Sequence, residues 1–119
     1  MSQITTHILD TATGKPACNV PVQLEQSIDD DGRLKWVELA NGVTDENGRI
    51  TNLLANSTEV IAGDYKFRFN TKKYFESQSQ EGLYPCIEII FSINESQCEE
   101  HFHIPLLISP FGYSTYRGS

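Results

Sequence analysis

Short runs of alternating apolar and polar residues, separated by frequent turn signals, dominate the chain. Because successive side chains of a β-strand point to opposite faces, each run predicts a strand with one face in the core. Turn sequences such as Asn41-Gly42 and Asp45-Glu46-Asn47-Gly48 recur at short intervals. Many short strands with frequent turns are typical of a β-sandwich or barrel. The clearest predicted strands cover residues 20–25, 65–70, 86–93 and 101–109, and weaker ones cover 4–9, 34–43 and 112–117.

One segment, residues 71–78, does not follow this alternation. Asn70 or Thr71 is suited to cap a helix here, because its side-chain oxygen can accept hydrogen bonds from the free N–H groups of the first turn. Tyr74 and Phe75 would pack such a helix onto the edge of a sheet. The sequence therefore predicts an all-β protein with one short helix.

The composition is that of one folded domain over residues 1–119. Apolar residues make up 39% of the chain and charged residues 21%, which is too apolar and too low in charge for a disordered protein. The longest apolar stretch covers residues 104–108. A membrane-spanning helix needs about 20 such residues, so none is expected. The first residues show no basic region followed by an apolar one, so a secretory signal is not expected either.

Charge and cysteine content narrow the class of protein further. The formal net charge is −7 and no basic stripe is present to replace phosphate counterions, so nucleic acid is not an expected partner. Cys18, Cys86 and Cys98 form an odd set without a Cys-x-x-Cys pair, which favours reduced thiols over a disulfide framework. The three aspartates at 29–31 indicate a solvated hairpin tip, because the later ligands of a calcium loop are missing.

The predicted strand over residues 101–109 has an unusual outer face. His101 and His103 share this face with Leu107, opposite an apolar core face. A face that combines histidines with a leucine indicates a cover, such as a subunit or a ligand. Two ordinary surface histidines are the simpler alternative. A metal site is another, since a His-x-His pair on a strand places both imidazoles on one side. No third ligand lies nearby in the sequence, so the metal site stays a minor alternative.

The remaining candidate chemistry lies near the two ends of the chain and in one turn. Tyr116 and Arg117, with the terminal carboxylate, give the last predicted strand a dense set of polar groups. His7 lies opposite the apolar face of the first predicted strand, and Arg49 follows the Asn47-Gly48 turn. Taken singly, these residues fit ordinary solvated positions, and their spacing does not predict that they meet. The common motifs of serine hydrolases, phosphate loops, zinc proteases and dinucleotide-binding proteins are absent from the sequence.

Residues 6–17 (THILDTATGKPA) and 101–119 (HFHIPLLISPFGYSTYRGS) are similar to the opening and closing motifs of the family of 5-hydroxyisourate hydrolases, the transthyretin-related enzymes of urate breakdown. Residues 44–49 (TDENGR) are similar to its central arginine motif, and Tyr84-Pro85 before the 87–93 strand also fits. The resemblance covers nearly the whole chain. The closing Tyr-Arg-Gly-Ser is its most specific part, because it separates these enzymes from the transthyretin hormone carriers.

The resemblance implies a fold, an assembly and a set of site residues. The fold would be a transthyretin-like two-sheet antiparallel β-sandwich of about eight strands with one short helix, in agreement with the alternation. The assembly would be a homotetramer, a dimer of dimers with active sites in a channel at the dimer–dimer interface, which would cover the His103 face. The implied catalytic residues are His7, Arg49, His103 and Ser119, and the implied substrate-binding residues are His7, Arg49, Tyr116, Arg117 and Gly118.

The implied reaction is hydrolysis of 5-hydroxyisourate to 2-oxo-4-hydroxy-4-carboxy-5-ureidoimidazoline, in which water opens the six-membered ring at an amide bond. His7 and His103 would position and activate the water, because imidazole titrates in the useful pH range; the sequence leaves the base and acid roles open between them. Arg49 would bind the substrate and stabilise negative charge on the attacked carbonyl. Tyr116 and the terminal residues would shape and close the pocket. No cofactor, metal or covalent nucleophile is required.

Two other classes of function stay open at this point. A non-catalytic carrier of a small aromatic ligand, like transthyretin, would use the same channel but should line it with apolar groups and lack the Tyr-Arg-Gly-Ser ending. A generic interaction module would leave the polar C-terminus unexplained. The resembled family includes cytoplasmic, periplasmic and peroxisomal members. Without a signal and with three cysteines, we expect a cytoplasmic protein, and Arg117-Gly118-Ser119 is not the usual peroxisomal tripeptide.

Overall fold

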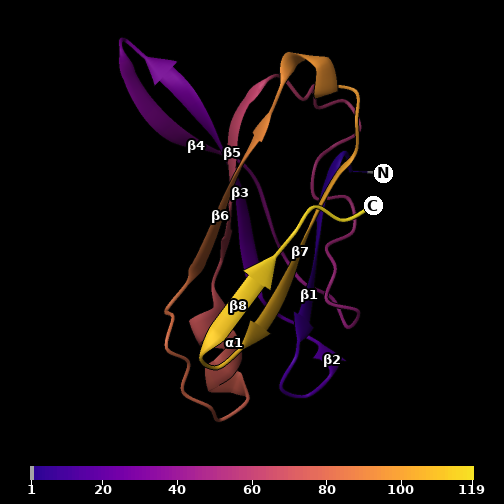
Figure 1. The fold of residues 1–119 in the computed structure, drawn as a ribbon, viewed down its shortest axis with the longest axis vertical. Helices are drawn as coiled ribbons and strands as arrows, with labels where there is room; N and C mark the ends of the chain where they lie inside the picture. The colour runs from indigo at the N-terminus through magenta and orange to yellow at the C-terminus, as the bar shows by residue number, and fades with distance from the viewer. Residues whose placement is uncertain (1) are drawn as a thin grey trace.

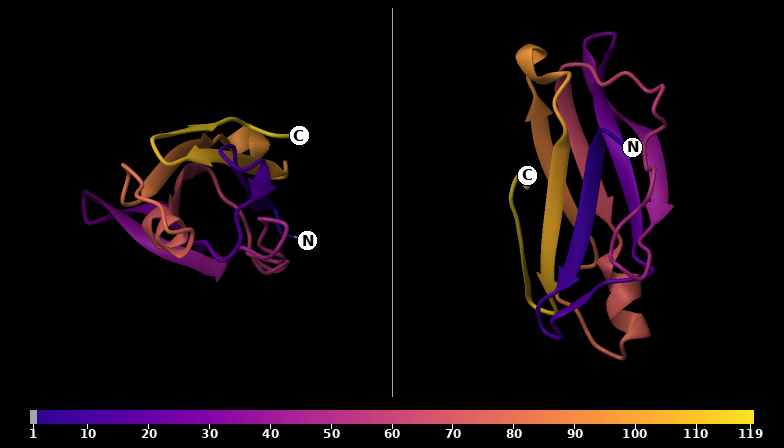
Figure 2. Two further views of the ribbon diagram at one scale, coloured as in Figure 1. Left: turned by 90° about the horizontal axis from the view of Figure 1, so that it is seen from below. Right: turned by 90° about the vertical axis from the view of Figure 1, so that its right-hand side faces the viewer.

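Two four-stranded sheets lie face to face in the computed structural model, which describes residues 2–119 (Figures 1 and 2). The first sheet has the order β2-β1-β7-β8 and the second the order β4-β3-β5-β6. The prediction of an all-β sandwich is confirmed. The first sheet consists of β1 (Ile4–Asp10), β2 (Lys15–Pro16), β7 (Phe102–Ser109) and β8 (Gly112–Thr115). The second consists of β3 (Pro21–Asp30), β4 (Arg33–Val43), β5 (Gly63–Phe69) and β6 (Ile87–Ile93).

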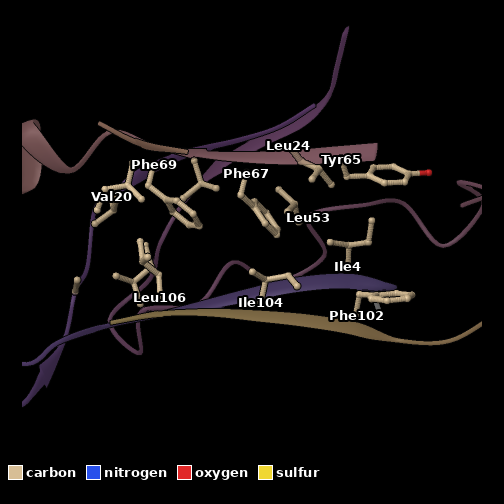
Figure 3. Packing of buried hydrophobic residues seen from close by; sticks show 14 of the residues in the cluster. Ile4, Val20, Leu24, Leu53, Tyr65, Phe67, Phe69, Phe102, Ile104 and Leu106 are labelled. Atoms are coloured by element: carbon tan, nitrogen blue, oxygen red, sulfur yellow. The ribbon is translucent and has the colours of Figure 1, made fainter. Parts of the chain in front are cut away.

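The core lies between the two sheets and uses the faces that the alternation predicts. Tyr65, Phe67 and Phe69 of β5 are buried, and so are the even-numbered residues of β7 from Phe102 to Ile108. Figure 3 shows the labelled members of this set, on β5 and β7, pointing toward one another from the two layers. Burying one such side chain contributes about 1.5–3 kcal/mol to folding. The register of each strand is therefore set by which of its faces is apolar.

The pairing of β1 with β7 is parallel, whereas the other strand pairs found within residues 2–119 are antiparallel. The expected antiparallel sandwich is thus found with one parallel pair. A parallel pair requires a crossover connection, and here the connection runs through the whole second sheet. Thr5 lies opposite His103 in this register. The pairing therefore places residues from the two ends of the sequence side by side (Figure 1).

The helix α1 (Thr71–Ser77) follows β5 at one end of the sandwich, as predicted. Asn70 is the cap, and its side-chain oxygen accepts a hydrogen bond from the Lys73 N–H at 3.4 Å. Tyr74 and Phe75 are buried. The Tyr74 hydroxyl donates to the Asp10 carboxylate at 2.7 Å. This bond holds the helix against the end of β1 and satisfies a carboxylate that is only 1% exposed.

The structure differs from the predicted strands in a few places. The last strand ends at Thr115 instead of residue 117, because the chain then leaves β8 and Gly118 forms an isolated bridge with His103. The two-residue strand β2 and a 3-10 helix over Glu95–Gln97 were not predicted. The 3-10 helix begins with a reciprocal hydrogen-bonding arrangement between Asn94 and Gln97, a signal that is readable in the sequence.

The aspartate-rich segment forms the tip of the β3–β4 hairpin, which projects beyond the rest of the sandwich (Figure 1). Asp31 and Gly32 have φ angles of 53° and 84°, and the Asp29 carboxylate accepts from the Gly32 N–H at 2.9 Å. The hairpin-tip prediction is therefore confirmed. The three cysteines are free thiols. Between residues 2 and 119 there is no helix with the length and apolarity that a membrane crossing requires.

Candidate functional site

The first strand and one turn bring His7 and Arg49 together. Ile4, Thr6 and Ile8 of β1 are buried, so His7 points to the opposite face of the strand. The main chain of Arg49 forms an isolated antiparallel bridge with His7. The neighbouring Ile8 N–H donates to the Gly48 carbonyl at 2.9 Å. The turn that carries the arginine is therefore hydrogen-bonded directly to the edge of β1.

The sequence of this turn explains its shape. The Asp45 carboxylate accepts from the N–H groups of Asn47 and Arg49 at 2.8 and 3.1 Å. Gly48 has φ +74°, and a Cβ atom at this position would collide with the Ile8 carbonyl oxygen. Only glycine tolerates both the backbone conformation and the close approach. The Asp-x-Asn-Gly-Arg pattern thus fixes Arg49 in register with His7.

His103 is held from two sides. In the parallel β1–β7 register it lies opposite Thr5, and the Thr5 hydroxyl is 2.8 Å from the ring Nδ1. On the other side the Gly118 N–H donates to the His103 carbonyl at 2.8 Å. A Cβ atom on Gly118 would lie 2.6 Å from Cδ2 of the imidazole and 3.2 Å from Cγ of Pro105. Glycine at position 118 therefore lets the end of the chain pass against the imidazole ring.

This terminal segment supplies part of the cover that the histidine face requires. Pro105 lies on the same face as His103 but is buried, and it contacts the segment around Gly118. The Thr115 hydroxyl donates to the Pro105 carbonyl at 2.7 Å. His103 is half-buried and His101 remains exposed. The sequence argument anticipated a subunit or a ligand over this face, whereas the chain's own last residues cover some of it.

The site residues line an open pocket of about 480 Å³. The pocket joins six of the seven predicted site residues and adds three that were not predicted, namely Thr5, Thr6 and His101. Thr5 and His7 are two residues apart on β1, so the alternation of the strand places both on its outer face and could have predicted Thr5 in the pocket. The predicted residues in the lining are His7, Arg49, His103, Tyr116, Gly118 and Ser119.

Arg117 is the predicted site residue that the structure places elsewhere. Its Nη2 donates to a Glu100 carboxylate oxygen at 3.0 Å and to the His101 carbonyl at 3.2 Å. The guanidinium lies 4.2 Å from the centre of the Phe102 ring, a cation–π distance. Arg117 is thus outside the pocket lining and holds the terminal segment against the start of β7.

The electrostatics of the pocket keep both of its half-buried imidazoles neutral. Burial lowers the pKa of His7 below its ordinary value, and the positive charge of Arg49 lowers it further. Burial also lowers the pKa of His103, followed by the effects of Arg49, His101 and His7. The pocket therefore combines two neutral bases with one guanidinium. Within the described residues 2–119, no three His, Cys, Asp or Glu side chains are grouped so that they could hold a metal ion.

A second hollow of about 660 Å³ lies over the second sheet. Its lining includes Arg68 and Glu38 but none of the histidines. Arg68 is also 3.9 Å from the Glu88 carboxylate, so its charge is already paired. Although this hollow is larger, it lacks a group that titrates near neutral pH. The smaller pocket at β1 and β7 is the better candidate for chemistry.

Residues 4–118 match the sequence profile of the Transthyretin family, described as the HIUase/Transthyretin family. The chain belongs to the HIUase/transthyretin family. A Salmonella dublin protein named 5-hydroxyisourate hydrolase is 46% identical over 116 residues, which cover 98% of this chain and 80% of that protein. The family resemblance inferred from the sequence motifs is therefore confirmed.

Solved structures of the HIUase/transthyretin family share the fold of this chain. The 5-hydroxyisourate hydrolase of Klebsiella pneumoniae is 39% identical, with a TM-score of 0.78 and 98% of each chain covered. Sea bream transthyretin in complex with thyroxine is 32% identical, with a TM-score of 0.87, covering 98% of this chain and 95% of that one. The fold thus occurs in a protein named as a hydrolase and in a transthyretin that binds thyroxine, and the contents of the pocket must separate the two functions.

Proposed function

We propose that this member of the HIUase/transthyretin family is an enzyme that hydrolyses 5-hydroxyisourate in urate degradation. The single observation that carries the proposal is the pocket in which His7, His103 and Arg49 meet the terminal segment. Two neutral imidazoles beside a guanidinium can activate water and stabilise an oxyanion. The names of the Salmonella dublin and Klebsiella pneumoniae relatives point to the same substrate.

The proposed reaction opens the six-membered ring at an amide bond. A neutral imidazole accepts a proton from water as the water oxygen bonds to the carbonyl carbon. Arg49 binds the substrate and stabilises the negative charge that develops on the carbonyl oxygen. The carbon–nitrogen bond then breaks, and the departing ring nitrogen takes up the proton that the imidazole held. The product is 2-oxo-4-hydroxy-4-carboxy-5-ureidoimidazoline.

His103 is the proposed base in this scheme. Thr5 occupies its Nδ1, so Nε2 is the nitrogen left to accept a proton from water. Its lowered pKa keeps the ring neutral at neutral pH, and Nε2 can accept a proton when the ring carries its own proton on Nδ1. His7, on the neighbouring strand and also neutral, orients the water or the ring. Tyr116 and Ser119 close the pocket over the substrate.

A transthyretin-like carrier is the alternative, and one observation favours it: the sea bream transthyretin structure has the higher TM-score, 0.87 against 0.78. That score compares backbones, which carriers and hydrolases share. The side chains favour the enzyme, because a pocket for an apolar aromatic ligand does not need two histidines and an arginine. Thyroxine binding to the isolated protein, measured by calorimetry, tests the carrier reading directly.

The proposal includes a homotetramer, a dimer of dimers with the sites at the dimer–dimer interface. Its support is the unusual apolar exposure of the single chain: Phe111 is 74% exposed and Leu83 is 62% exposed. The Leu83 N–H donates to the carbonyl of Pro110, the residue before Phe111, at 2.8 Å, so the two exposed side chains belong to neighbouring segments. Contiguous exposed apolar surface marks association sites. β6 and β8 are edge strands with unpaired backbone groups, which also favour association. The three free thiols suit the cytoplasm, where we place the protein.

The test follows the ultraviolet absorbance of 5-hydroxyisourate generated in place by urate oxidase. We expect the wild type to accelerate the decay above the spontaneous rate, and Arg49→Ala and His103→Asn to lose most of this acceleration. Undiminished turnover by His103→Asn would remove His103 from the mechanism. Sedimentation under the assay conditions tests the assembly. Full activity in a form smaller than a tetramer would contradict sites at the dimer–dimer interface.

A further inference from the structure

The Thr5 hydroxyl lies between two imidazole rings. Its Oγ1 is 2.8 Å from Nδ1 of His103 and 3.2 Å from Nε2 of His101. The two rings are stacked, with centroids 6.4 Å apart and planes 9° from parallel. The arrangement follows from the fold. Thr5 pairs with His103 in the β1–β7 register, and His101 precedes His103 by two residues, so the two imidazoles lie on the same face. A continuous line of polar atoms therefore runs from the half-buried His103 ring through Thr5 to the exposed His101 ring.

A hydroxyl group carries one proton, so Oγ1 can donate to one of these rings while it accepts from the other. If His101 donates from Nε2, the hydroxyl donates to Nδ1 of His103, and a neutral His103 carries its proton on Nε2. If the hydroxyl donates to His101, His103 donates from Nδ1, and its Nε2 is bare. The two rings are thus coupled through a single proton. A protonated His101 can only donate, so it permits only the first state.

We propose that Thr5 and His101 are positioning residues that set which ring nitrogen of His103 carries the proton. The claim about the tautomer stands on the geometry alone, whereas its catalytic consequence rests on the proposed hydrolase function. In that reaction the state with bare Nε2 is the base. Neither positioning residue needs to touch the reacting atoms.

The same line of atoms provides a balanced path for the proton. When Nε2 of His103 takes a proton from water, the Nδ1 proton passes to Thr5 Oγ1 and the hydroxyl proton passes to Nε2 of His101. His103 is then neutral, with its proton on Nε2, and the positive charge is on His101. When Nε2 delivers that proton to the departing ring nitrogen, the three transfers reverse. The site returns to its starting state with no net gain or loss of protons.

The surroundings of the two rings favour the transfer of positive charge from His103 to His101. Burial and the Arg49 guanidinium disfavour a positive charge on His103. His101 is exposed to solvent, which stabilises an imidazolium there. The path therefore moves the charge from a half-buried ring beside a cation to a hydrated ring. The charged and titratable groups near the two rings are Arg49 and His7 on the pocket side, Glu100 and Arg117 beside His101, and the carboxylate of Ser119.

The direct test reads the ring nitrogens by NMR in the ligand-free protein labelled with nitrogen-15 histidine. In the wild type we expect the nitrogen shifts of His103 to change in the pH step in which His101 titrates. Thr5→Val should abolish that step in His103, and Thr5→Ser, which keeps the hydroxyl, should retain it. Thr11→Val is the matched control, because Thr11 lies just after β1 and donates to the Ile108 carbonyl of β7 at 3.0 Å, outside the pocket. An unchanged His103 titration in Thr5→Val would overturn the proposal.

A kinetic test uses the decay of 5-hydroxyisourate. Thr5→Val should lower kcat about tenfold with little change in KM, the lower end of the loss that follows removal of a hydrogen-bond partner from a metal-bound histidine. His101→Ala changes an exposed residue and should lower kcat similarly without disturbing β1. The double variant should be no slower than either single variant, because both interrupt one path. Losses of kcat that add in the double variant, or full activity in Thr5→Val, would contradict the proposal.

The two tests separate the failure of this proposal from the failure of the proposed function. A wild type that does not accelerate the decay, but shows the coupled titration, would refute the hydrolase and support the coupling. An active wild type whose His103 titrates alone would support the hydrolase and refute the coupling.

Discussion

Replacing Gly118 with alanine tests whether the close contact between the terminal segment and His103 matters for function. The added Cβ would lie 2.6 Å from Cδ2 of the ring, and ordinary contact begins at 3.4 Å, so the two must separate by about 0.8 Å. Either the segment or the imidazole moves, and the 2.8 Å bond from the Gly118 N–H to the His103 carbonyl is strained. A misplacement of about 1 Å in an active site can lower a rate about 100-fold.

The stability of the fold should change far less than the activity. The segment lies at the edge of the sheet, and a single backbone hydrogen bond contributes about 1 kcal/mol. We therefore expect the kcat of Gly118→Ala to be about 10- to 100-fold lower than that of the wild type. Its free energy of unfolding in urea should fall by about 1 kcal/mol, the contribution of that one bond.

Gly112→Ala is the matched control for this experiment. It adds the same methyl group in the same hairpin, where the nearest neighbour is the Ser109 hydroxyl at 3.8 Å. We expect its turnover of 5-hydroxyisourate to equal that of the wild type. Wild-type turnover by Gly118→Ala would refute the reasoning, since it would show that the position of the segment against His103 does not matter.

Four further predictions concern the imidazoles and the helix. Burial and Arg49 lower the pKa values of His7 and His103, so their neutral forms persist at pH values below the ordinary pKa of 6.5. The measured kcat/KM should therefore stay constant as the pH is lowered past 6.5 and fall only in more acidic solution. Arg49→Ala should raise both pKa values toward 6.5 without reaching it, since burial is the larger cause; NMR titration measures this. At pH values between the lowered pKa and 6.5, these histidines bind more protons in the unfolded chain than in the folded one. The free energy of unfolding should therefore also fall as the pH drops through that window. Tyr74→Phe removes the donor to buried Asp10 and should lower the free energy of unfolding by about 1–3 kcal/mol, measured in urea, with turnover unchanged.

The strand faces were predictable from the sequence, because each strand buries one side and alternation records that burial. The outward orientation of His7 and His103 follows from the buried neighbours of each residue. The short helix was predictable for a similar local reason, since its cap and its two buried aromatics lie within a few residues of one another. The family motifs added the fold and the candidate site by resemblance.

The assembly of the site was not readable from local sequence. Thr5 and His103 are 98 residues apart, and no alternation pattern records that β1 pairs with β7 or that the pair is parallel. The position of Arg117 depends on the Glu100 carboxylate and the Phe102 ring, which the closing motif does not reveal. The tetramer stays a prediction that sedimentation can test.

The parallel pairing of β1 with β7 has a consequence for synthesis of the protein on the ribosome. β1 leaves the exit tunnel before its hydrogen-bonding partner β7 is translated, because all the strands of the second sheet lie between the two in the sequence. Until β7 is made, β1 presents an edge whose backbone groups lack this partner. The second sheet, whose strands are consecutive apart from α1, can form before β1 and β7 pair. A nascent chain must therefore keep β1 from pairing with a neighbouring copy on the same polysome. The pocket completes only when β7 and the residues after it are released.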